Sequence, residues 1–495
     1  MSLVLHLALL TLLAEIWLRP AMQGTGQIEL ISNSEQTTRE LDTAVEHEPL
    51  ETRLREVAVN AVLAPALAEA GAGAVAVTPP VVPRVEPELV STSIDWRNAA
   101  KEGLANLPGV GMGGTLSGRG TGLRQYMADK HGGSAASEEA VDRALKWLAE
   151  HQFADGSWSL QMGTCPKCQG RCRNPGTLPG TRVAATGLAL LPFLGAGYTH
   201  KEGQYKTVVN NGLHYLLRQS KTGSRVGALN ESGGGMYSHG IATIALCEAH
   251  AMTYDRILQF PAQQAVRFIC DAQDPNSGGW RYHPLQSPGD TSVIGWQLMA
   301  LKSARLCDMP VPPAVLSKAE RFLDSVQMEE GSRYQYLPSG KTPVPPLPPQ
   351  VQVVVVKEAS AYNATTAIGL LCRMFLGWKR DNPALHNGVA YLADLGPSKG
   401  NMYYNYYATQ VMWHWEGEEW RKWNDVMREM LIQTQSRQGH ETGSWHFAAE
   451  GEDRDEGTRA GGRLYMTALA TMILEIYYRH MPIYAKLDLQ AEPSP

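Results

Sequence analysis

Two hydrophobic patterns alternate along residues 137–487 and predict pairs of helices. In the first pattern, apolar residues recur every three or four positions, as in Glu138–Gln152, which predicts an amphipathic helix with one buried face. In the second pattern nearly every position is apolar, as in RVAATGLALL from Arg182. A helix without a polar face is buried on all sides, and these runs are too short to span a bilayer. The alternation therefore predicts outer helices that cover inner helices.

The pair of patterns recurs about six times, with a spacing of roughly 45–70 residues, close to the periods of helical-repeat proteins. The amphipathic segments end near residues 152, 219, 273, 327, 395 and 435, and the apolar helices start near Arg182, His239, Asp290, Asn363, Tyr404 and Leu464. An open array normally has polar caps at both ends. Neither the first nor the last unit has one, so we expect a closed ring. The predicted fold is all-α, an α/α toroid of about six helical hairpins over residues 137–487, with residues 488–495 as a tail.

Glutamine ends most of the amphipathic segments. The glutamines are Gln152, Gln219, Gln273, Gln327 and Gln435. A glutamine amide can satisfy backbone groups that a helix end leaves open. The first, third and fifth of these glutamines are followed by Gly-x-Trp. The glycine permits a turn, and we expect the tryptophan to pack back over the end of the helix.

The residues before 137 have a different character. Residues 2–13 form an apolar run, which predicts a membrane anchor or signal-like segment over residues 1–20. We favour an uncleaved anchor with the toroid outside the cytoplasm, either membrane-anchored or exported; an amphipathic start helix is the alternative. Residues 21–136 are rich in Ala, Val, Pro, Glu and Gly. They offer few large apolar groups to offset chain entropy, which predicts a low-complexity, largely disordered tether.

Composition narrows the function classes. The net charge is -5 and no basic run is present, so a nucleic-acid partner is not expected, because a surface that follows phosphates is normally basic. Seven cysteines in 495 residues are too few for a disulfide scaffold.

Three of the cysteines are clustered. Cys165, Cys168 and Cys172 have C-x2-C-x3-C spacing, and the C-x2-C part is a zinc half-site because both thiolates can reach one ion. His151 or His200 could complete the site, but the sequence selects neither. A disulfide is the alternative if the domain is exported. We expect the cluster to have a structural role and not to hold a catalytic metal. Structural zinc is the one cofactor considered.

The Gln–Gly-x-Trp repeats resemble the QW motif of squalene–hopene cyclases and the related repeats of protein prenyltransferase β subunits. Over residues 137–487 the chain is similar to bacterial prenyltransferase/squalene-oxidase-repeat proteins. The resemblance implies an α/α toroid with a central apolar cavity suited to an isoprenoid or lipid ligand. An active protein of this kind would be a terpenoid cyclase-like isomerase or a prenyltransferase-like transferase. The alternative is a non-catalytic toroid, tethered to a membrane, that acts as a binding scaffold.

The reactive motifs of these families are only partly matched. Squalene–hopene cyclases carry D-x-D-D-T-A, whose middle Asp protonates an alkene. Asp290 matches the last Asp, while Ser287 and Gly289 replace the first and the middle ones. Prenyltransferases bind zinc through an Asp and a Cys two residues later, but Ser292 follows Asp290 at that position. Asp290 remains a candidate acid, and a helix N-cap is its other interpretation.

The starts of the inner helices are polar or aromatic, and a closed ring would bring them to one mouth. We predict Asp290 and His239 as an acid–base pair at this mouth. Aromatic faces can stabilise a cation or pack an isoprenoid. The predicted substrate-binding residues are Arg182, Tyr237, Trp296, Asn363, Tyr404, Tyr406 and Tyr465. The alternative is that these residues are helix caps and satisfied polar groups in a large core.

Overall fold

The computed structural model describes residues 116, 119–221, 225–338, 358–447 and 456–484. All of them belong to the larger of two compact units, Glu48–Pro495. The predicted anchor, the tail and most of the predicted tether lie outside the described residues. Within the described ranges, no helix is long and apolar enough to cross a membrane.

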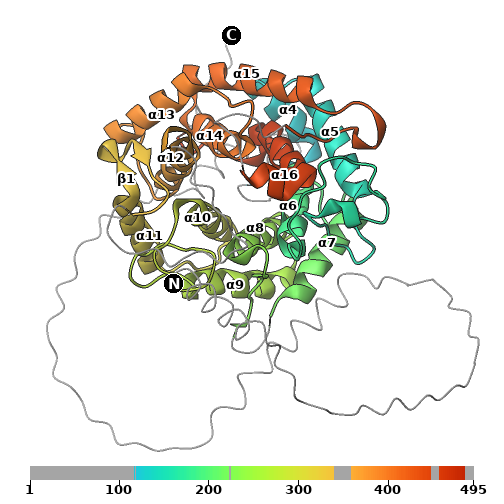
Figure 1. Cartoon of the computed structure of the whole chain (residues 1–495), viewed down its shortest axis with the longest axis horizontal. Helices are drawn as coiled ribbons and strands as arrows, with labels where there is room; N and C mark the ends of the chain where they lie inside the picture. The colour runs from blue at the N-terminus through green and yellow to red at the C-terminus, as the bar shows by residue number, and fades with distance from the viewer. Residues whose placement is uncertain (1–115, 117–118, 222–224, 339–357, 448–455, 485–495) are drawn as a thin grey trace, which may run out of the picture. The chain divides into compact units, whose positions relative to one another are not determined.

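Two concentric layers of helices form the described structure (Figure 1). The inner helices are α6 (Arg182–Gly195), α8 (Gly235–Thr253), α10 (Thr291–Leu306), α12 (Glu358–Phe375), α14 (Met402–Trp415) and α16 (Glu456–Leu474). The outer helices are α5 (Ala135–Glu150), α7 (Lys206–Gln219), α9 (Arg256–Asp271), α11 (Pro313–Val326), α13 (Pro383–Leu395) and α15 (Gly417–Thr434). Each inner helix contacts the next one, and α16 contacts α6. The inner helices therefore close into a ring, and the predicted α/α toroid of six hairpins is confirmed.

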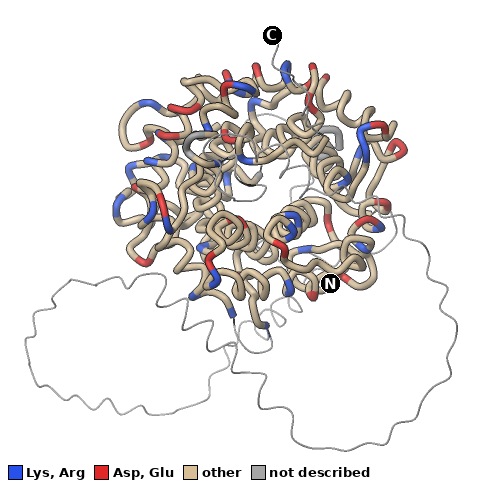
Figure 2. Tube along the Cα trace, turned by 180° about the vertical axis from the view of Figure 1, so that it is seen from behind, with Lys and Arg blue, Asp and Glu red and all other residues tan. Residues whose placement is uncertain are grey.

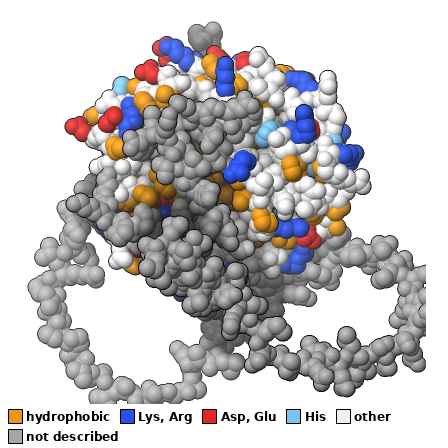
Figure 3. Space-filling view, in the orientation of Figure 1, with side chains coloured by type: hydrophobic (Ala, Val, Ile, Leu, Met, Phe, Trp, Pro, Cys, Tyr) orange, Lys and Arg blue, Asp and Glu red, His pale blue; other side chains and the backbone are white. Residues whose placement is uncertain are grey.

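Burial explains why the two layers differ in sequence. Every residue of α6 after Arg182 is buried, whereas α9 buries one stripe. Most charged positions lie on the outer layer (Figure 2). On the described part of the face in Figure 3, charged, polar and hydrophobic side chains are intermingled. Smaller elements complete the fold: η2 (Met162–Thr164), β1 (Gln327–Met328) paired antiparallel with β2 (Arg333–Tyr334), η4 (Glu329–Gly331), η5 (Gly439–Glu441) and α17 (Ile476–Arg479).

Glutamine side chains link neighbouring outer helices. In three hairpins, the glutamine Nε2 donates one hydrogen bond to the carbonyl of the following turn glycine and one to a carbonyl of the next outer helix. The acceptors are Gly156 and Val208 for Gln152, Gly278 and Val315 for Gln273, and Gly443 and Ala140 for Gln435, at 2.8–3.0 Å. The third set joins α15 to α5 and closes the outer layer. The bonds to the turn glycines correspond to the predicted role at a helix end, and the bonds to the next outer helix add a link that the sequence did not predict.

The tryptophans of the same repeats cap the outer helices. Each indole Nε1 donates a 2.8 Å hydrogen bond to the carbonyl four residues before the repeat glutamine. The pairs are Trp158 with Leu148, Trp280 with Ile269 and Trp445 with Leu431. The two repeat glutamines without a following Gly-x-Trp behave differently: Gln219 is exposed, and Gln327 accepts a hydrogen bond from Arg373.

The ordered structure begins before the predicted boundary at 137. Residues Thr121–His131 form helix α4, which lies within the predicted tether, and α4 contacts α17. The N-cap of α5 is Ser134, so this helix also begins before the boundary at 137. Ser134 and Ser137 form a capping box, in which each side chain binds the other's backbone N–H. The polar sequence of α4 has no strong apolar period, which is why the pattern of positions does not reveal it.

Candidate functional site

The N-terminal ends of α8, α10 and α14 meet at one end of the ring. There, a group of side chains that we call the mouth cluster surrounds one buried carboxyl. Its members are Asp290, Tyr237, Tyr282, Tyr336 and Tyr403. The Tyr282 and Tyr336 hydroxyls are 2.6 Å apart, and Tyr237 lies 6.1 Å from Tyr282 between ring centroids. Tyr403 bonds the Ser292 hydroxyl at 2.8 Å. The predicted convergence of helix starts is therefore found for three of the inner helices.

Asp290 has two oxygens in different environments. Its Oδ1 accepts a 2.7 Å hydrogen bond from the Val293 N–H, so the residue is the N-cap of α10. Its Oδ2 is buried without a hydrogen-bond partner, although the Tyr336 hydroxyl lies near enough to favour the charged form. Burial raises the pKa of Asp290 to about 7, against the opposing effects of the Val293 N–H and Arg281. Near neutral pH a large fraction of this carboxyl is protonated.

A buried guanidinium adjoins the mouth cluster. Arg281 is 2% exposed, and its Nε and Nη1 have no hydrogen-bond partner. Its guanidinium carbon lies 5.7 Å from the centroid of the Tyr282 ring, and its charge favours the ionised form of Asp290. Buried N–H groups without partners are costly. A bound anion or carbonyl oxygen would satisfy them.

An aromatic wall runs from the mouth into the ring. Trp296 donates a hydrogen bond to the Tyr403 hydroxyl at 3.1 Å and stacks on Tyr406 with centroids 5.7 Å apart. Tyr407 packs edge-on against both Trp296 and Tyr406. Burial raises the pKa of Tyr406 to about 12, so its ring stays neutral. Two predicted substrate-binding residues, Trp296 and Tyr406, thus lie in contact.

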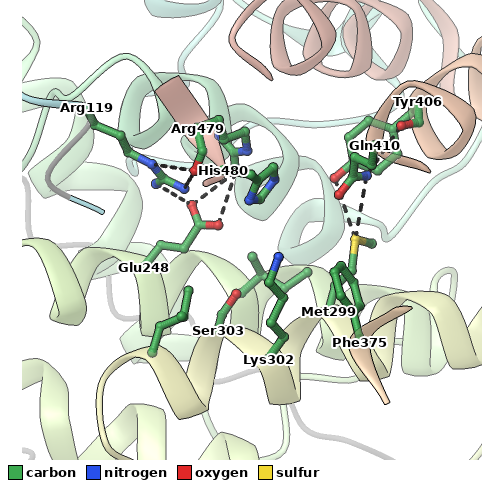
Figure 4. Close-up of a pocket in the computed structure, with 12 residues that line it drawn as sticks. Arg119, Glu248, Met299, Lys302, Ser303, Phe375, Tyr406, Gln410, Arg479 and His480 are labelled. Atoms are coloured by element: carbon green, nitrogen blue, oxygen red, sulfur yellow. Dashed lines mark hydrogen bonds and ion pairs between the residues drawn. The ribbon is translucent and has the colours of Figure 1, made fainter. Parts of the chain in front are cut away.

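The opposite ends of the inner helices enclose a charged network (Figure 4). Arg119 and Arg479 both pair with Glu248, at 2.8 and 3.0 Å. Burial raises the pKa of Glu248, but these two guanidiniums outweigh that effect and hold the pKa below its usual value. Burial lowers the pKa of Lys302 to about 7 and raises that of Glu475 to about 8. Glu475 pairs with Arg479 at 3.3 Å, but burial outweighs this attraction, and both Lys302 and Glu475 are shifted toward their neutral forms.

The cavity beside this network is small. Its volume is about 20 Å³, which is room for roughly one water molecule. Polar side chains, among them Lys302, Gln410 and His480, line much of it. Charged and aromatic side chains therefore leave little free space at this described end of the ring.

The predicted acid–base pair is not formed. His239 Nδ1 accepts a 3.0 Å hydrogen bond from the Leu229 N–H, and Nε2 donates to the Ala265 carbonyl at 3.0 Å. Burial lowers the pKa of His239 to about 4. Both ring nitrogens are occupied by backbone groups, so His239 ties α8 to its loop and to α9 and has no nitrogen left for Asp290.

Three of the other predicted substrate-binding residues bond to loops or to the outer layer. Arg182 pairs with Asp155 at 2.9 Å and lies over the Phe153 ring. Asn363 accepts a hydrogen bond from Tyr391 of α13 at 2.7 Å. Tyr404 donates to the Gly396 carbonyl and packs on Trp423 of α15. Tyr465 is half-buried on α16, beside Gly461. The first three connect helices to loops or to the outer layer, which is the structural alternative stated for them.

The cysteine cluster lies between α5 and α6 and is buried. Cys168 and Cys172 face His440, with Sγ–Nδ1 distances of 3.8 and 3.2 Å. Cys165 is directed elsewhere, with its thiol 3.6 Å from the His151 carbonyl. His200 is paired with Asp255 at 3.0 Å. The prediction that all three cysteines share one site therefore needs correction for Cys165.

Several residues of these sites were not identified from the sequence. His440, Arg119 and Arg479 come from parts of the chain far from their partners, and only ring closure brings them there. Arg281 and Tyr282 directly follow the repeat Trp280. Their position at the end of a Gly-x-Trp turn, just before an inner helix, was the one available indication.

Comparisons with known proteins do not select a function. The sequence matches no protein-family model and no curated protein. Among solved structures, the apo type II terpene cyclase MstE from Scytonema has 13% identity and a TM-score of 0.44, over 69% of this chain and 97% of that one. Cellobiose 2-epimerase from Spirochaeta thermophila has 13% identity and a TM-score of 0.49, over 72% and 98%. The α-1,6-mannanase GH76A from Salegentibacter has 10% identity and a TM-score of 0.46, over 69% and 99%. Likeness this distant identifies neither a substrate nor a reaction.

Proposed function

We propose that the toroid binds an isoprenoid-like ligand with a polar head at the mouth cluster, and that Asp290 acts there as a general acid. The observation that carries this proposal is the Asp290 carboxyl, with one oxygen used as a helix cap and the other buried beside the Tyr336 hydroxyl. A carboxylic acid that must donate a proton has to be kept neutral. The burial that raises the pKa of Asp290 to about 7 provides this condition.

The surrounding residues support the same chemistry. The proton on Oδ2 would pass to an alkene, whose π electrons form the new C–H bond and leave a carbocation and the Asp290 carboxylate. The faces of Tyr403 and Trp296 would stabilise the cation. The cation would then close a ring and lose a proton to solvent, and solvent would protonate Asp290 again. The unpaired N–H groups of Arg281 would hold an anionic or carbonyl head group of the ligand.

The experiment uses two substitutions with different effects on the cap. Asparagine is as good an N-cap as aspartate, so Asp290→Asn removes the acid and keeps the cap, whereas Asp290→Ala removes both. The full chain would be incubated with squalene and with geranylgeranyl compounds that carry a carboxylate or phosphate, and products would be identified by mass spectrometry. We expect product from the parent chain and a loss of at least about 100-fold in both variants.

Ligand binding separates the outcomes. Native mass spectrometry should detect the isoprenoid on the parent chain and on Asp290→Asn, with weaker binding of an anionic ligand to Arg281→Met. Equal turnover by Asp290→Asn and the parent chain would exclude Asp290 as the acid. If the folded parent chain retains no isoprenoid at all, the ligand class is wrong.

A binding scaffold is the second candidate function. It is favoured by the network of Arg119, Glu248 and Arg479, which fills one end of the ring and leaves a cavity of about 20 Å³. A folded parent chain that neither binds nor converts any of these compounds would support it.

A further inference from the structure

Four metal-ligating side chains meet at the place where the ring closes. They are His151, Cys168, Cys172 and His440, and their ligand atoms all lie within 4.8 Å of one another. Three of the four side chains are buried, and His440 is partly exposed. Structural zinc is bound by four ligands, and Cys2His2 is one of its usual ligand sets, so these four residues are sufficient.

The distances fit a tetrahedral ion. With Zn–S bonds of about 2.3 Å and Zn–N bonds of about 2.0–2.1 Å, ligand atoms of one tetrahedral site lie roughly 3.3–3.8 Å apart. Cys172 Sγ lies 3.4 Å from His151 Nε2 and 3.2 Å from His440 Nδ1, and Cys168 Sγ lies 3.8 Å from His440 Nδ1. Three of the six pairs are thus at or near this spacing, and all ligand atoms lie within 4.8 Å of one another, so small side-chain shifts would place them around one ion.

His151 is also oriented as a ligand. Its Nδ1 lies 2.7 Å from the Trp147 carbonyl, which can only accept a hydrogen bond. Nδ1 therefore carries the proton, and Nε2, which faces Cys172, presents a lone pair. Metal-binding histidines commonly donate their other N–H to a backbone carbonyl in this way. Trp147 packs against the ring at 4.0 Å and fixes its orientation.

The four ligands come from the first and the last helical hairpins, which meet where the ring closes. His151 directly follows α5, and the two cysteines lie in the loop between α5 and α6, in the first hairpin. His440 lies in η5, between α15 and α16 of the last hairpin. A surface depression lined by Lys146, Glu150, Lys167, Arg171 and His440 reaches the site from solvent.

We propose that His151, Cys168, Cys172 and His440 bind one Zn²⁺ that fastens the first helical hairpin to the last. On binding, the two thiols lose their protons to solvent and both sulfurs coordinate as thiolates. Cys165 takes no part, because its thiol lies against the His151 carbonyl. The ion is a structural fastener and is independent of the chemistry proposed at Asp290.

The first test measures zinc in the full chain, purified without chelators. We expect about one Zn²⁺ per chain by elemental analysis, a background level in Cys172→Ser and His440→Ala, and an unchanged content in the matched control Cys165→Ser. Replacement by Co²⁺ should give a thiolate charge-transfer band in the parent chain and in the control. Loss of zinc from Cys165→Ser alone, or a zinc-free parent chain with a Cys168–Cys172 disulfide, would overturn the proposal.

The second test examines the closure of the ring and does not require the variants to fold. A chelator is added to the parent chain, and amide hydrogen exchange is followed. Exchange should increase at residues 147–173 and 435–447, while α9 and α11, on other hairpins, keep their protection. Exchange that stays the same at these two segments after zinc removal would show that the ion does not fasten the ring.

Discussion

Asp290 combines two roles through its two oxygens. Oδ1 fixes the start of α10, and Oδ2 is left in a buried space beside tyrosines. The sequence predicts the residue as either an acid or an N-cap, and the structure shows the N-cap bond on one oxygen while the other is buried. The N-cap is confirmed, and the acid remains a proposal.

The raised pKa of Asp290 predicts a pH-dependent stability. The folded-state pKa of about 7 exceeds the ordinary aspartate value of 3.8, so between these values the folded chain binds more protons and loses stability as pH rises. Asp290→Asn removes this dependence. Relative to the parent chain, the variant should gain a few kcal/mol in the free energy of unfolding between pH 4 and 8, about 1.4 kcal/mol for each pKa unit.

Urea unfolding of both proteins at several pH values measures this gain. The difference between the two proteins is the relevant quantity, because Lys302 and Glu475 also titrate in this range and contribute equally to both. A difference that does not change with pH would mean that the Asp290 pKa is not raised.

Residue type predicted the site only partly. Tyr237, Trp296, Tyr406 and Asp290 lie at or beside the mouth cluster as expected. His239 and Tyr404 are equally polar or aromatic at helix starts, yet they bond to backbone carbonyls away from it. The direction of each side chain depends on the rotation of its helix within the ring. A pattern that is apolar all round contains no information about this rotation.

At the scale of elements, the repeat glutamines are structural connectors. Each of Gln152, Gln273 and Gln435 joins its own turn to the next outer helix. Periodicity predicts the six hairpins because inner and outer helices bury different fractions of their surface. Boundaries are less well predicted: the first two residues of α5, Ala135 and Ala136, are exposed and extend no apolar stripe, and α4 has only a weak one.

We predict that Gln273→Ala destabilises the fold while Gln219→Ala does not. Gln273 is 4% exposed and donates to the Gly278 and Val315 carbonyls, and buried carbonyls that lose their donor cost about 1–3 kcal/mol. Gln219 ends a comparable outer helix but is exposed, so its replacement should change stability by less than about 0.5 kcal/mol. Urea unfolding of the two variants and the parent chain gives the comparison. Equal effects would contradict the connector role.

At the scale of the whole molecule, the first and the last described segments of the chain are in direct contact. Arg119 donates to the Arg479 carbonyl at 2.9 Å and pairs with Glu248 of α8. The His131 and Gly132 carbonyls accept hydrogen bonds from Trp420 and Asn424 of α15. The segment before the first hairpin is therefore an integral part of the ring structure.

This predicts the effect of two truncations. A chain that starts at residue 137, the boundary expected from the pattern, lacks Arg119, α4 and the Ser134 cap. It should be less stable than a chain that starts at residue 112 by at least about 3 kcal/mol, since removing one partner of a buried ion pair costs about 3–5 kcal/mol. Urea unfolding measures the difference. Equal midpoints would show that α4 and Arg119 contribute nothing.

Ring closure also has a consequence during protein synthesis. The Gln435 bond to Ala140 joins residues 295 positions apart. At roughly 5–20 residues per second, the first hairpin leaves the ribosome about 15–60 s before the last one exists. During this time the side of α5 and α6 that later contacts α15 and α16 has no partner, and it is the surface on which we expect a chaperone to act. The contacts made last in translation are those that complete the toroid.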